Sequence, residues 1–224
     1  MLSQKVWIII PAHNEEENIG KVIKDLKELT SNILVINDGS TDRTLEICQI
    51  NNVLAVSHMV NRGQGAALQT GNEMALNLGA EIIVHFDADG QHQVQDIAKI
   101  IEPLLNEQAD LVFGSRFLEN KSKIPWLKKY FILKPAIFFN WLFTGLKLSD
   151  AHNGFRALSK KAAQQINIRQ DGMAHATEIM NQVRQYDLKY QEVGVEIIYQ
   201  EYGQGLWGGI RIIEDLFLSK ITKK

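Results

Sequence analysis

The sequence predicts an α/β fold, a Rossmann-like, mostly parallel β-sheet flanked by helices. The first observation is that short apolar runs of strand length alternate with segments that repeat apolar residues at helical spacing. The second is that these connections are long enough for helices, so consecutive strands can run parallel with right-handed crossovers. The third is that several strand-like runs end in polar clusters. Ligands bind at the carboxyl ends of the strands in open α/β sheets, so these clusters mark the expected site.

The first half of the chain is expected to alternate strands and helices. The run from Val6 to Ile10 predicts a buried strand because it is wholly apolar and Pro11 ends it. Ile19, Val22 and Leu26 then recur at helical spacing. The predicted elements, in order, are strand 6–10, helix 19–29, strand 33–36, helix 41–50, strand 53–56, helix 64–78, strand 82–86, helix 97–105 and strand 110–113.

The second half is less regular. Residues 121–148 mix lysines with aromatic and aliphatic side chains, and a helix near 175–187 and a strand near 192–199 are expected after them. From Leu206 to Ile221, apolar residues recur every three or four positions with charged residues between them. We therefore expect a helical, amphipathic C-terminal region within a single domain spanning 1–224.

Composition excludes several classes of protein. A length of 224 residues suits one domain, and a net charge of −2 gives no excess of basic residues for nucleic acid. Cys48 is the only cysteine, which excludes an internal disulfide and a cysteine-rich zinc site and favours a reducing compartment. Because a strand-like run begins near the N-terminus, we expect no signal peptide. The apolar region 131–148 is a poor candidate for a membrane-spanning helix, because Lys134, Pro135, Asn140 and Lys147 interrupt it. We expect a cytosolic protein.

The most informative stretch follows the strand predicted at 82–86. Asp87, Asp89 and Gln91 are spaced two residues apart, so they can point the same way from extended chain. Carboxylate and amide oxygens are the ligands that a hard divalent cation prefers. Because such a cation usually holds phosphates, this stretch predicts a nucleotide-diphosphate site. The alternative is that Asp-x-Asp here only forms a turn.

Two other strand ends carry polar residues. Strand 6–10 is followed by Pro11-Ala12-His13-Asn14-Glu15-Glu16, and strand 33–36 by Asn37-Asp38-Gly39-Ser40. Each could be only a helix cap or a tight turn. Because parallel strands bring their carboxyl ends to the same edge, we favour a pocket in which these groups bind a base and a ribose.

Six motifs in order carry a resemblance to a known family. They are Pro11-Ala12-His13-Asn14-Glu15-Glu16, Asn37-Asp38-Gly39-Ser40-Thr41-Asp42, Asn61-Arg62-Gly63-x-Gly65, Asp87-Ala88-Asp89-Gly90-Gln91-His92, Gly114-Ser115-Arg116 and Asn153-Gly154-Phe155-Arg156. Over residues 6–158 the chain resembles the family 2 glycosyltransferases of GT-A fold. The resemblance is greatest to the branch that contains dolichol-phosphate mannose synthase and bacterial polyprenyl-phosphate sugar transferases.

The resemblance implies a role for individual residues. It implies a metal cluster of Asp87, Asp89 and Gln91 holding Mg²⁺ or Mn²⁺, and a nucleotide-binding half over 1–115 with an acceptor- and membrane-facing half over 116–224. Arg116 and Arg156 are expected near the phosphates, and Asp89 and Asp150 complete the catalytic set. The nucleotide-binding residues that it implies are Pro11, Ala12, Asn14, Glu16, Asp38, Arg62, Gly65, Asp87 and Ala88.

Together with these residues, the resemblance implies a metal-dependent, inverting transfer of a sugar from a nucleotide diphosphate sugar to polyprenyl phosphate. The loop 199–205 lacks the basic residues of the mannose synthases, which favours a UDP-sugar donor carrying N-acetylglucosamine or glucose. The first alternative is transfer to a hydroxyl of a polysaccharide, with Asp150 as the base. Alternatives of another class are a sugar nucleotidyltransferase and a catalytically silent binding subunit.

Residues 116–149 are the expected acceptor side. They hold seven basic residues against one acid, with aromatic side chains among them, which suits an anionic membrane surface. The alternative is an aromatic core under solvated lysines, or an oligomer contact. We expect a cytoplasmic protein, peripheral at the inner face of the membrane, with a small membrane protein or a second copy as a possible partner. Cys48 and the histidines His58, His85, His152 and His175 are interpreted as structural.

Overall fold

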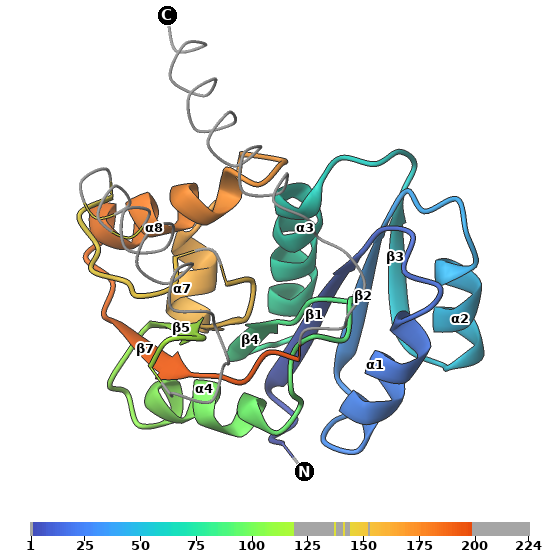
Figure 1. Cartoon of the computed structure of the whole chain (residues 1–224), viewed down its shortest axis with the longest axis horizontal. Coiled ribbons are helices and arrows are strands. Elements are labelled where there is room, and N and C mark those ends of the chain that lie inside the picture. The colour runs from blue at the N-terminus through green and yellow to red at the C-terminus, as the bar shows by residue number, and fades with distance from the viewer. Residues whose placement is uncertain (1, 119–136, 138–140, 142–143, 152, 199–224) are drawn as a thin grey trace, which may run out of the picture.

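The computed structural model describes residues 2–118, 137, 141, 144–151 and 153–198, and it contains one seven-stranded sheet (Figure 1). The strand order is β3-β2-β1-β4-β6-β5-β7. The strands are β1 (Val6–Ala12), β2 (Ile33–Asp38), β3 (Leu54–His58), β4 (Ile82–His85), β5 (Leu111–Ser115), β6 (Arg156–Ser159) and β7 (Tyr190–Gly194). The helices are α1 (Ile19–Lys27), α2 (Thr44–Ile50), α3 (Gln64–Asn77), α4 (Asp96–Leu105), α7 (Lys160–Gln165) and α8 (His175–Gln185).

The first four strands along the chain pair in parallel, as the sequence predicts. β1 lies between β2 and β4, and β3 extends the sheet beyond β2. β6 is antiparallel to both β4 and β5, and β7 is parallel to β5. The parallel pairing brings the carboxyl ends of β1, β2 and β4 to one edge of the sheet.

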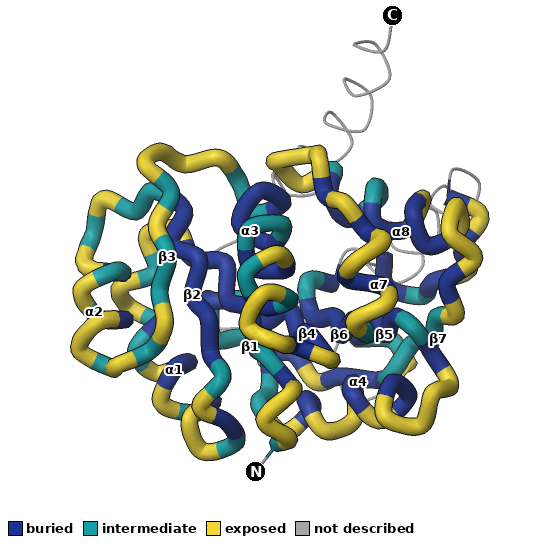
Figure 2. The backbone as a smooth tube through the Cα atoms, turned by 180° about the vertical axis from the view of Figure 1, so that it is seen from behind, coloured by how far each residue is buried: buried dark blue, intermediate teal, exposed yellow. Residues whose placement is uncertain are grey.

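Helices cover both faces of the sheet (Figures 1 and 2). One core lies under α1, α2 and α4 and receives Ile8 and Ile10 from β1. The other lies under α3, α7 and α8 and receives Ile9. Alternate residues of β1 therefore enter opposite cores, as the two-residue period of a strand requires. The inner strands β1, β2, β4 and β5 are buried on both faces, which explains why they read as apolar runs, whereas the edge strands β3 and β7 are partly exposed.

Helix α3 packs closely against the sheet. A Cβ at Gly71 would lie 2.2 Å from Ile9 Cγ2, so only glycine allows this approach. Ala67 and Ala75 on the same helix are fully buried against the sheet. The small residues hold the first turn of α3, which begins at Gln64, near the carboxyl edge of the strands.

The structure corrects several element boundaries. The helix expected over 41–50 begins at Thr44, because Asp42 Oδ1 accepts hydrogen bonds from the Thr44 amide and hydroxyl and fixes a turn before it. The strand expected at 192–199 runs from Tyr190 to Gly194. β6 and α7 were not predicted; α7 begins where Ser159 Oγ accepts a hydrogen bond from the Ala162 amide.

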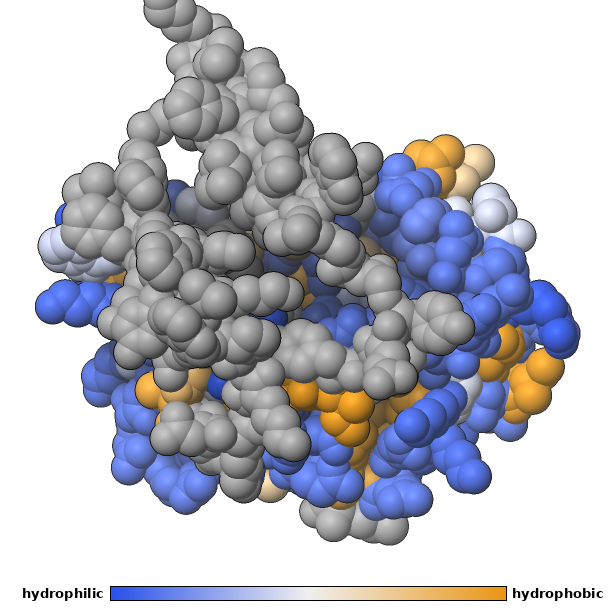
Figure 3. All heavy atoms as spheres, in the orientation of Figure 1, coloured by the Kyte–Doolittle hydropathy of each residue, from blue (hydrophilic) through white to orange (hydrophobic). Residues whose placement is uncertain are grey.

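Most of the expected acceptor side lies outside the described residues, as does the predicted amphipathic helix of 206–221. No helix in the described part of the chain has the length and apolarity needed to cross a membrane. On the face seen in Figure 3, the described surface is mostly hydrophilic with separate apolar patches.

Candidate active site

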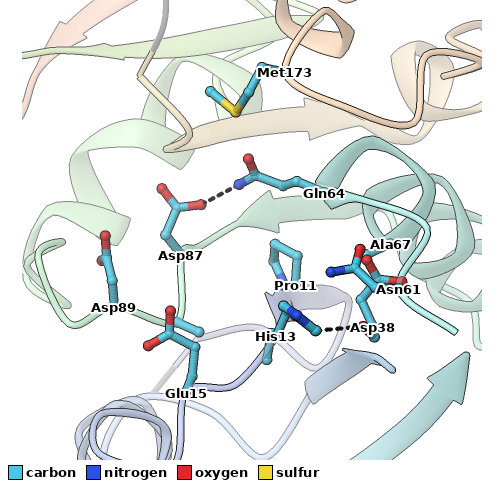
Figure 4. Close-up of a pocket in the computed structure, with 12 residues that line it drawn as sticks. Pro11, His13, Glu15, Asp38, Asn61, Gln64, Ala67, Asp87, Asp89 and Met173 are labelled. Carbon is cyan, nitrogen blue, oxygen red and sulfur yellow. Dashed lines mark hydrogen bonds between the residues drawn. The ribbon is translucent and has the colours of Figure 1, made fainter. Parts of the chain in front are cut away.

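The carboxyl ends of β1, β2 and β4 enclose a cavity of about 380 Å³ (Figure 4). The end of β1, the end of β2, the start of α3 and the turn after β4 each contribute to its wall. The lining residues are Pro11, Ala12, His13, Glu15, Asp38, Asn61, Gln64, Ala67, Asp87, Ala88, Asp89 and Met173. Pro11, Ala12, Asp38, Asp87, Ala88 and Asp89 were predicted from the sequence as site residues, and the structure brings them together.

Asp38, the last residue of β2, organises one side of the pocket. Its carboxylate accepts hydrogen bonds from the Arg62 amide at 2.9 Å and the Gly63 amide at 2.6 Å. His58 Nδ1 donates to the same carboxylate at 2.7 Å. Gly63 has φ +102°, a conformation that favours glycine. The buried acid thus fixes the loop 61–63, and His58, which the sequence analysis set aside as structural, helps to hold that acid.

Asp87 is held from three directions. Gln64 Nε2 donates to its Oδ1 at 2.9 Å, and His92 Nε2 donates to its Oδ2 at 2.8 Å. Gly154 lies directly against the carboxylate, since a Cβ there would be 2.3 Å from Oδ2. Burial would raise the pKa of Asp87, but the His92 hydrogen bond and the nearby positive charges, including Arg156, outweigh burial and lower this pKa. Asp87 is therefore an anion at neutral pH.

Asp89 and Glu15 point into the same space as Asp87 (Figure 4). Burial raises the pKa of Asp89, and the charge of Asp87 adds to this effect. Burial also raises the pKa of Glu15, against the hydrogen bond from Asn18, and the charges of nearby acids including Asp89 raise it further. Like charges raise one another's pKa values where no cation separates them, so this wall of the pocket attracts positive charge.

The donor set fits a hard divalent cation. Asp87 and Asp89 offer carboxylate oxygens, which suit Mg²⁺ and Mn²⁺. The Gln91 amide donates to Asp89 Oδ1 at 3.0 Å, which fixes the turn, but the Gln91 side chain does not line the pocket. Within the described residues no group of three or more His, Cys, Asp or Glu side chains forms a metal site by itself. Two carboxylates leave coordination positions for phosphate oxygens, as Mg²⁺ sites commonly do.

Four residues predicted to bind nucleotide do not line the pocket. Asn14 Oδ1 accepts a hydrogen bond from the Thr41 amide, and Glu16 Oε2 accepts one from the Arg43 amide, so both side chains join the loop after β1 to the turn before α2. The other two are Arg62, whose side chain is half exposed with its nearest acid 4.0 Å away at Asp171, and Gly65, whose amide donates to the Asp171 carbonyl.

Six lining residues are not among those predicted from the sequence. His13, Glu15, Asn61 and Gln64 lie inside the six motifs, which mark the loops of the pocket but do not distinguish side chains that enter it from those that hold the loops together. Ala67 lies on α3, which follows the loop 61–63. Met173 lies far along the chain, before α8, and no local pattern marks it.

A second polar group lies at the end of β5. Arg116 donates from Nε and Nη2 to the two carboxylate oxygens of Asp150, at 2.6 and 2.7 Å. Glu192 Oε1, on β7, accepts hydrogen bonds from the Asp150 amide and from the amide and hydroxyl of Ser149. Glu192 was not found from the sequence, because a carboxylate within a strand near the end of the chain gives no pattern.

Arg156 begins β6 and is buried, with an exposed fraction of 1%. Its Nε and Nη1 have no hydrogen-bond partner among the described residues. Burial lowers the pKa of this guanidinium to about 10, while the charges of Asp87 and Asp150 oppose the shift. At neutral pH it is therefore a charged group, close to both acids, with donors available for an anionic oxygen.

Comparison with known sequences decides the family. The profile of "Glycosyl transferase family 2" matches residues 7–166, which is more than half of the chain. The chain belongs to glycosyl transferase family 2. The expectation drawn from the six motifs is confirmed, and the protein is a family 2 glycosyltransferase with a GT-A fold.

Relatives of this family 2 glycosyltransferase cover nearly all of its length. The UDP-N-acetylglucosamine--dolichyl-phosphate N-acetylglucosaminyltransferase of Methanococcus voltae is 33% identical over 249 residues, covering 100% of this chain and 99% of the relative. The polyprenol monophosphomannose synthase of Mycolicibacterium smegmatis is 26% identical, covering 96% of this chain and 85% of the relative. These relatives are polyprenyl-phosphate sugar transferases.

A solved structure supports the fold alone. Glucosyl-3-phosphoglycerate synthase from Mycobacterium tuberculosis, crystallised with Mn²⁺ and uridine diphosphate, aligns with a TM-score of 0.72 at 19% identity. The alignment covers 95% of this chain and 78% of the synthase.

Proposed function

We propose that this glycosyltransferase moves a sugar from a nucleotide diphosphate sugar to polyprenyl phosphate, with inversion at the anomeric carbon and with Mg²⁺ or Mn²⁺ as cofactor. The observation that carries the proposal is the pairing of an acidic wall, Asp87 and Asp89, with a buried and charged Arg156 close by. Such a site places cation-binding oxygens next to a phosphate-binding group.

In this proposal the nucleoside of the donor lies against Pro11, Ala12 and Asp38, and its diphosphate meets Asp87 and Asp89 through the divalent cation. Asn14, Glu16, Arg62 and Gly65 support this pocket indirectly, by joining the loops around it. When bound, a divalent cation stabilises the negative charge that develops on the leaving diphosphate. Gln91 reaches the cation only if its side chain turns toward the pocket, and we keep it as a third ligand in the proposal.

The contacts of Asp150 favour a phosphate acceptor over a hydroxyl. Both oxygens of this acid are occupied by Arg116, so it is placed to orient that guanidinium rather than to accept a proton. A phosphate acceptor is already an anion and needs no base, but it needs cationic groups to hold it. Arg116 and Arg156 supply these groups in the proposal.

The donor and the location rest on the relatives. UDP-N-acetylglucosamine is the donor named for the Methanococcus voltae enzyme, which supports a UDP-sugar carrying N-acetylglucosamine, with glucose as the second choice. A polyprenyl acceptor places the enzyme at the cytosolic face of the membrane, as a peripheral protein. A membrane-protein partner and self-association remain part of the proposal.

One experiment tests donor and acceptor together. The full chain is incubated with Mn²⁺, polyprenyl phosphate and, in turn, radiolabelled UDP-N-acetylglucosamine, UDP-glucose and GDP-mannose. Label is expected to enter the organic phase with a UDP-sugar, and neither chelator-treated enzyme nor Asp89→Ala should transfer it. Label that reaches only an added oligosaccharide would contradict the phosphate acceptor, and activity that survives chelator would contradict the cofactor.

A further inference from the structure

We propose that His92 is a positioning residue that holds the Asp87 carboxylate in the orientation a divalent cation requires. The inference rests on the proposed metal-dependent function and adds a residue that the six motifs contain without assigning it a role. Its basis is the surroundings of His92 rather than its sequence position.

The ring of His92 has a single hydrogen bond among the described residues, and it goes to Asp87. Nε2 lies 2.8 Å from Asp87 Oδ2, while Nδ1 is buried without a partner in this part of the chain. The carboxylate can only accept, so the ring carries its proton on Nε2. This histidine is 7% exposed, so water gives little competition for that bond.

Two aromatic rings fix the orientation of His92. Phe155 lies with its ring centre 4.9 Å from that of His92, and Phe86 contacts it edge-on at 5.4 Å. The two phenylalanines also contact each other at 5.4 Å. A ring enclosed in this way has little rotational freedom, so its Nε2 points at one place.

The backbone around His92 is held as well. His92 forms an isolated antiparallel bridge with Ile197, and the Gln91 carbonyl accepts a hydrogen bond from the Ile198 amide. The turn after β4 is therefore tied to the chain beyond β7. On the other side, Gly154 touches the Asp87 carboxylate.

These contacts leave Asp87 one orientation. Gln64 occupies one lone pair of Oδ1 and His92 one lone pair of Oδ2, and an ionised carboxylate has about four acceptor positions, so oxygens remain free for a cation. Groups that orient a metal-binding residue in this way typically change metal affinity by about 10–100-fold when they are removed. The same size of effect is expected at His92.

The test compares two substitutions that differ in one donor. His92→Phe keeps an aromatic ring in contact with Phe86 and Phe155 and removes the donor, whereas His92→Gln replaces it with an amide donor. Binding of Mn²⁺ in the presence of UDP is followed by electron paramagnetic resonance, and folding by circular dichroism and thermal melting. We expect His92→Phe to weaken Mn²⁺ binding about tenfold or more and His92→Gln to restore most of it.

Each outcome decides the inference. Folded His92→Phe with wild-type Mn²⁺ affinity would overturn it, as would an equal loss in the Phe and Gln variants. If His92→Phe does not fold, His92→Asn replaces it, because its shorter amide cannot reach Asp87, and the same loss is expected. A wild-type chain that binds no Mn²⁺ with UDP would overturn the proposed function too, whereas normal wild-type binding with unaffected variants overturns the role of His92 alone.

Discussion

The carboxylate of Asp87 rests on the backbone of Gly154, with no room for a methyl group between them. The three atoms nearest to a Cβ at Gly154 would all belong to the side chain of Asp87, at 2.3 to 2.9 Å. Because a side chain can swing away more easily than a backbone can move, we expect Gly154→Ala to displace the carboxylate and leave the fold intact. Transfer should fall about 100-fold, as a displacement of about 1 Å in a catalytic group can produce.

The measurement for Gly154→Ala is the steady-state rate beside the melting temperature. Gly172→Ala is the matched control, because a Cβ there meets nothing within 4 Å. A Gly154→Ala variant with wild-type activity would show that the Asp87 carboxylate can shift without loss of transfer, so that its exact position does not limit the rate.

Ionised Asp89 destabilises the metal-free protein, although the proposed function needs this carboxylate to bind the cation. Its pKa is raised first by burial and then by Asp87, so the native state binds this proton more tightly than the unfolded chain does. Stability must therefore fall as pH rises from the ordinary pKa of an aspartate to the raised native value, and the ionised group destabilises the metal-free protein at neutral pH.

We expect Asp89→Asn to melt at a higher temperature than the wild type at pH 7 without metal, while losing transfer activity. Asn keeps the oxygen that accepts the Gln91 amide, so the turn should survive. The difference in melting temperature should shrink below about pH 4, where the wild-type group is protonated. Melting curves at both pH values check this, and a lower melting temperature for Asp89→Asn at pH 7 would contradict it.

At the scale of single residues, the sequence identified which loops form the pocket better than which side chains enter it. Asp38, Asp87 and Asp89 were predictable because each lies at or just after the end of a strand of a mostly parallel sheet, and the carboxyl ends of such strands meet where ligands bind. Glu15 and Glu16 look alike in sequence, yet Glu15 faces the pocket and Glu16 caps the Arg43 amide. That difference depends on a contact between the loop after β1 and the turn before α2, which residue types alone do not specify.

Strand β7 holds in place the residues proposed to bind the acceptor, Arg116 and Asp150. Glu192 Oε1 accepts three hydrogen bonds from Ser149 and Asp150, and Asp150 in turn holds Arg116. We expect Glu192→Ala to loosen this loop and to lower kcat/KM for polyprenyl phosphate roughly tenfold or more, since hydrogen bonds to charged groups contribute about 1.5–3 kcal/mol each. Glu192→Gln is the control, because its carbonyl oxygen can still accept.

The affinity for Mn²⁺ and UDP is the measurement that distinguishes an effect on the donor site from an effect on the acceptor site. It should be unchanged in Glu192→Ala, because Glu192 touches neither Asp87 nor Asp89 in the hydrogen bonds of the described chain. Equal losses of nucleotide affinity and acceptor efficiency would contradict the separate role of this strand.

Among the elements, the five strands of the first half were predictable because each is a short run rich in apolar residues, and four of them, β1, β2, β4 and β5, are buried in the sheet, whereas β3 lies at its edge and is partly exposed. β6 was missed because it is short and begins with a buried arginine, which no strand pattern anticipates. Its position between β4 and β5 depends on tertiary contacts. In the strand register Arg156 lies opposite His85 on one side and Phe113 on the other, and both are far away in the sequence. Burial lowers the pKa of His85 to about 3, so a neutral imidazole lies beside that charge.

On the scale of the whole molecule, the two halves share one sheet. β5 of the first half pairs with β6 and β7 of the second, and the segment before α8 packs against the start of α3 and contributes Met173 to the pocket. Gly65 allows this approach, since a Cβ there would lie 2.0 Å from the Gln170 carbonyl oxygen. The pocket and the group formed by Arg116, Asp150 and Glu192 therefore belong to the same sheet, and we expect ligand binding at the pocket to stabilise the whole described fold.

This coupling predicts how melting responds to ligands. A ligand that binds only the native state at 100 times its dissociation constant stabilises by about 2.7 kcal/mol, which in a domain of this size raises the melting temperature by about 5–10 °C. We expect that shift for UDP with Mn²⁺, and a much smaller one for UDP with chelator, because the paired acids repel a bare diphosphate. Asp89→Asn should gain little from Mn²⁺. An equal shift with and without the cation would mean that the nucleotide is held by the loops around Asp38 alone, and that the acidic wall serves some other step.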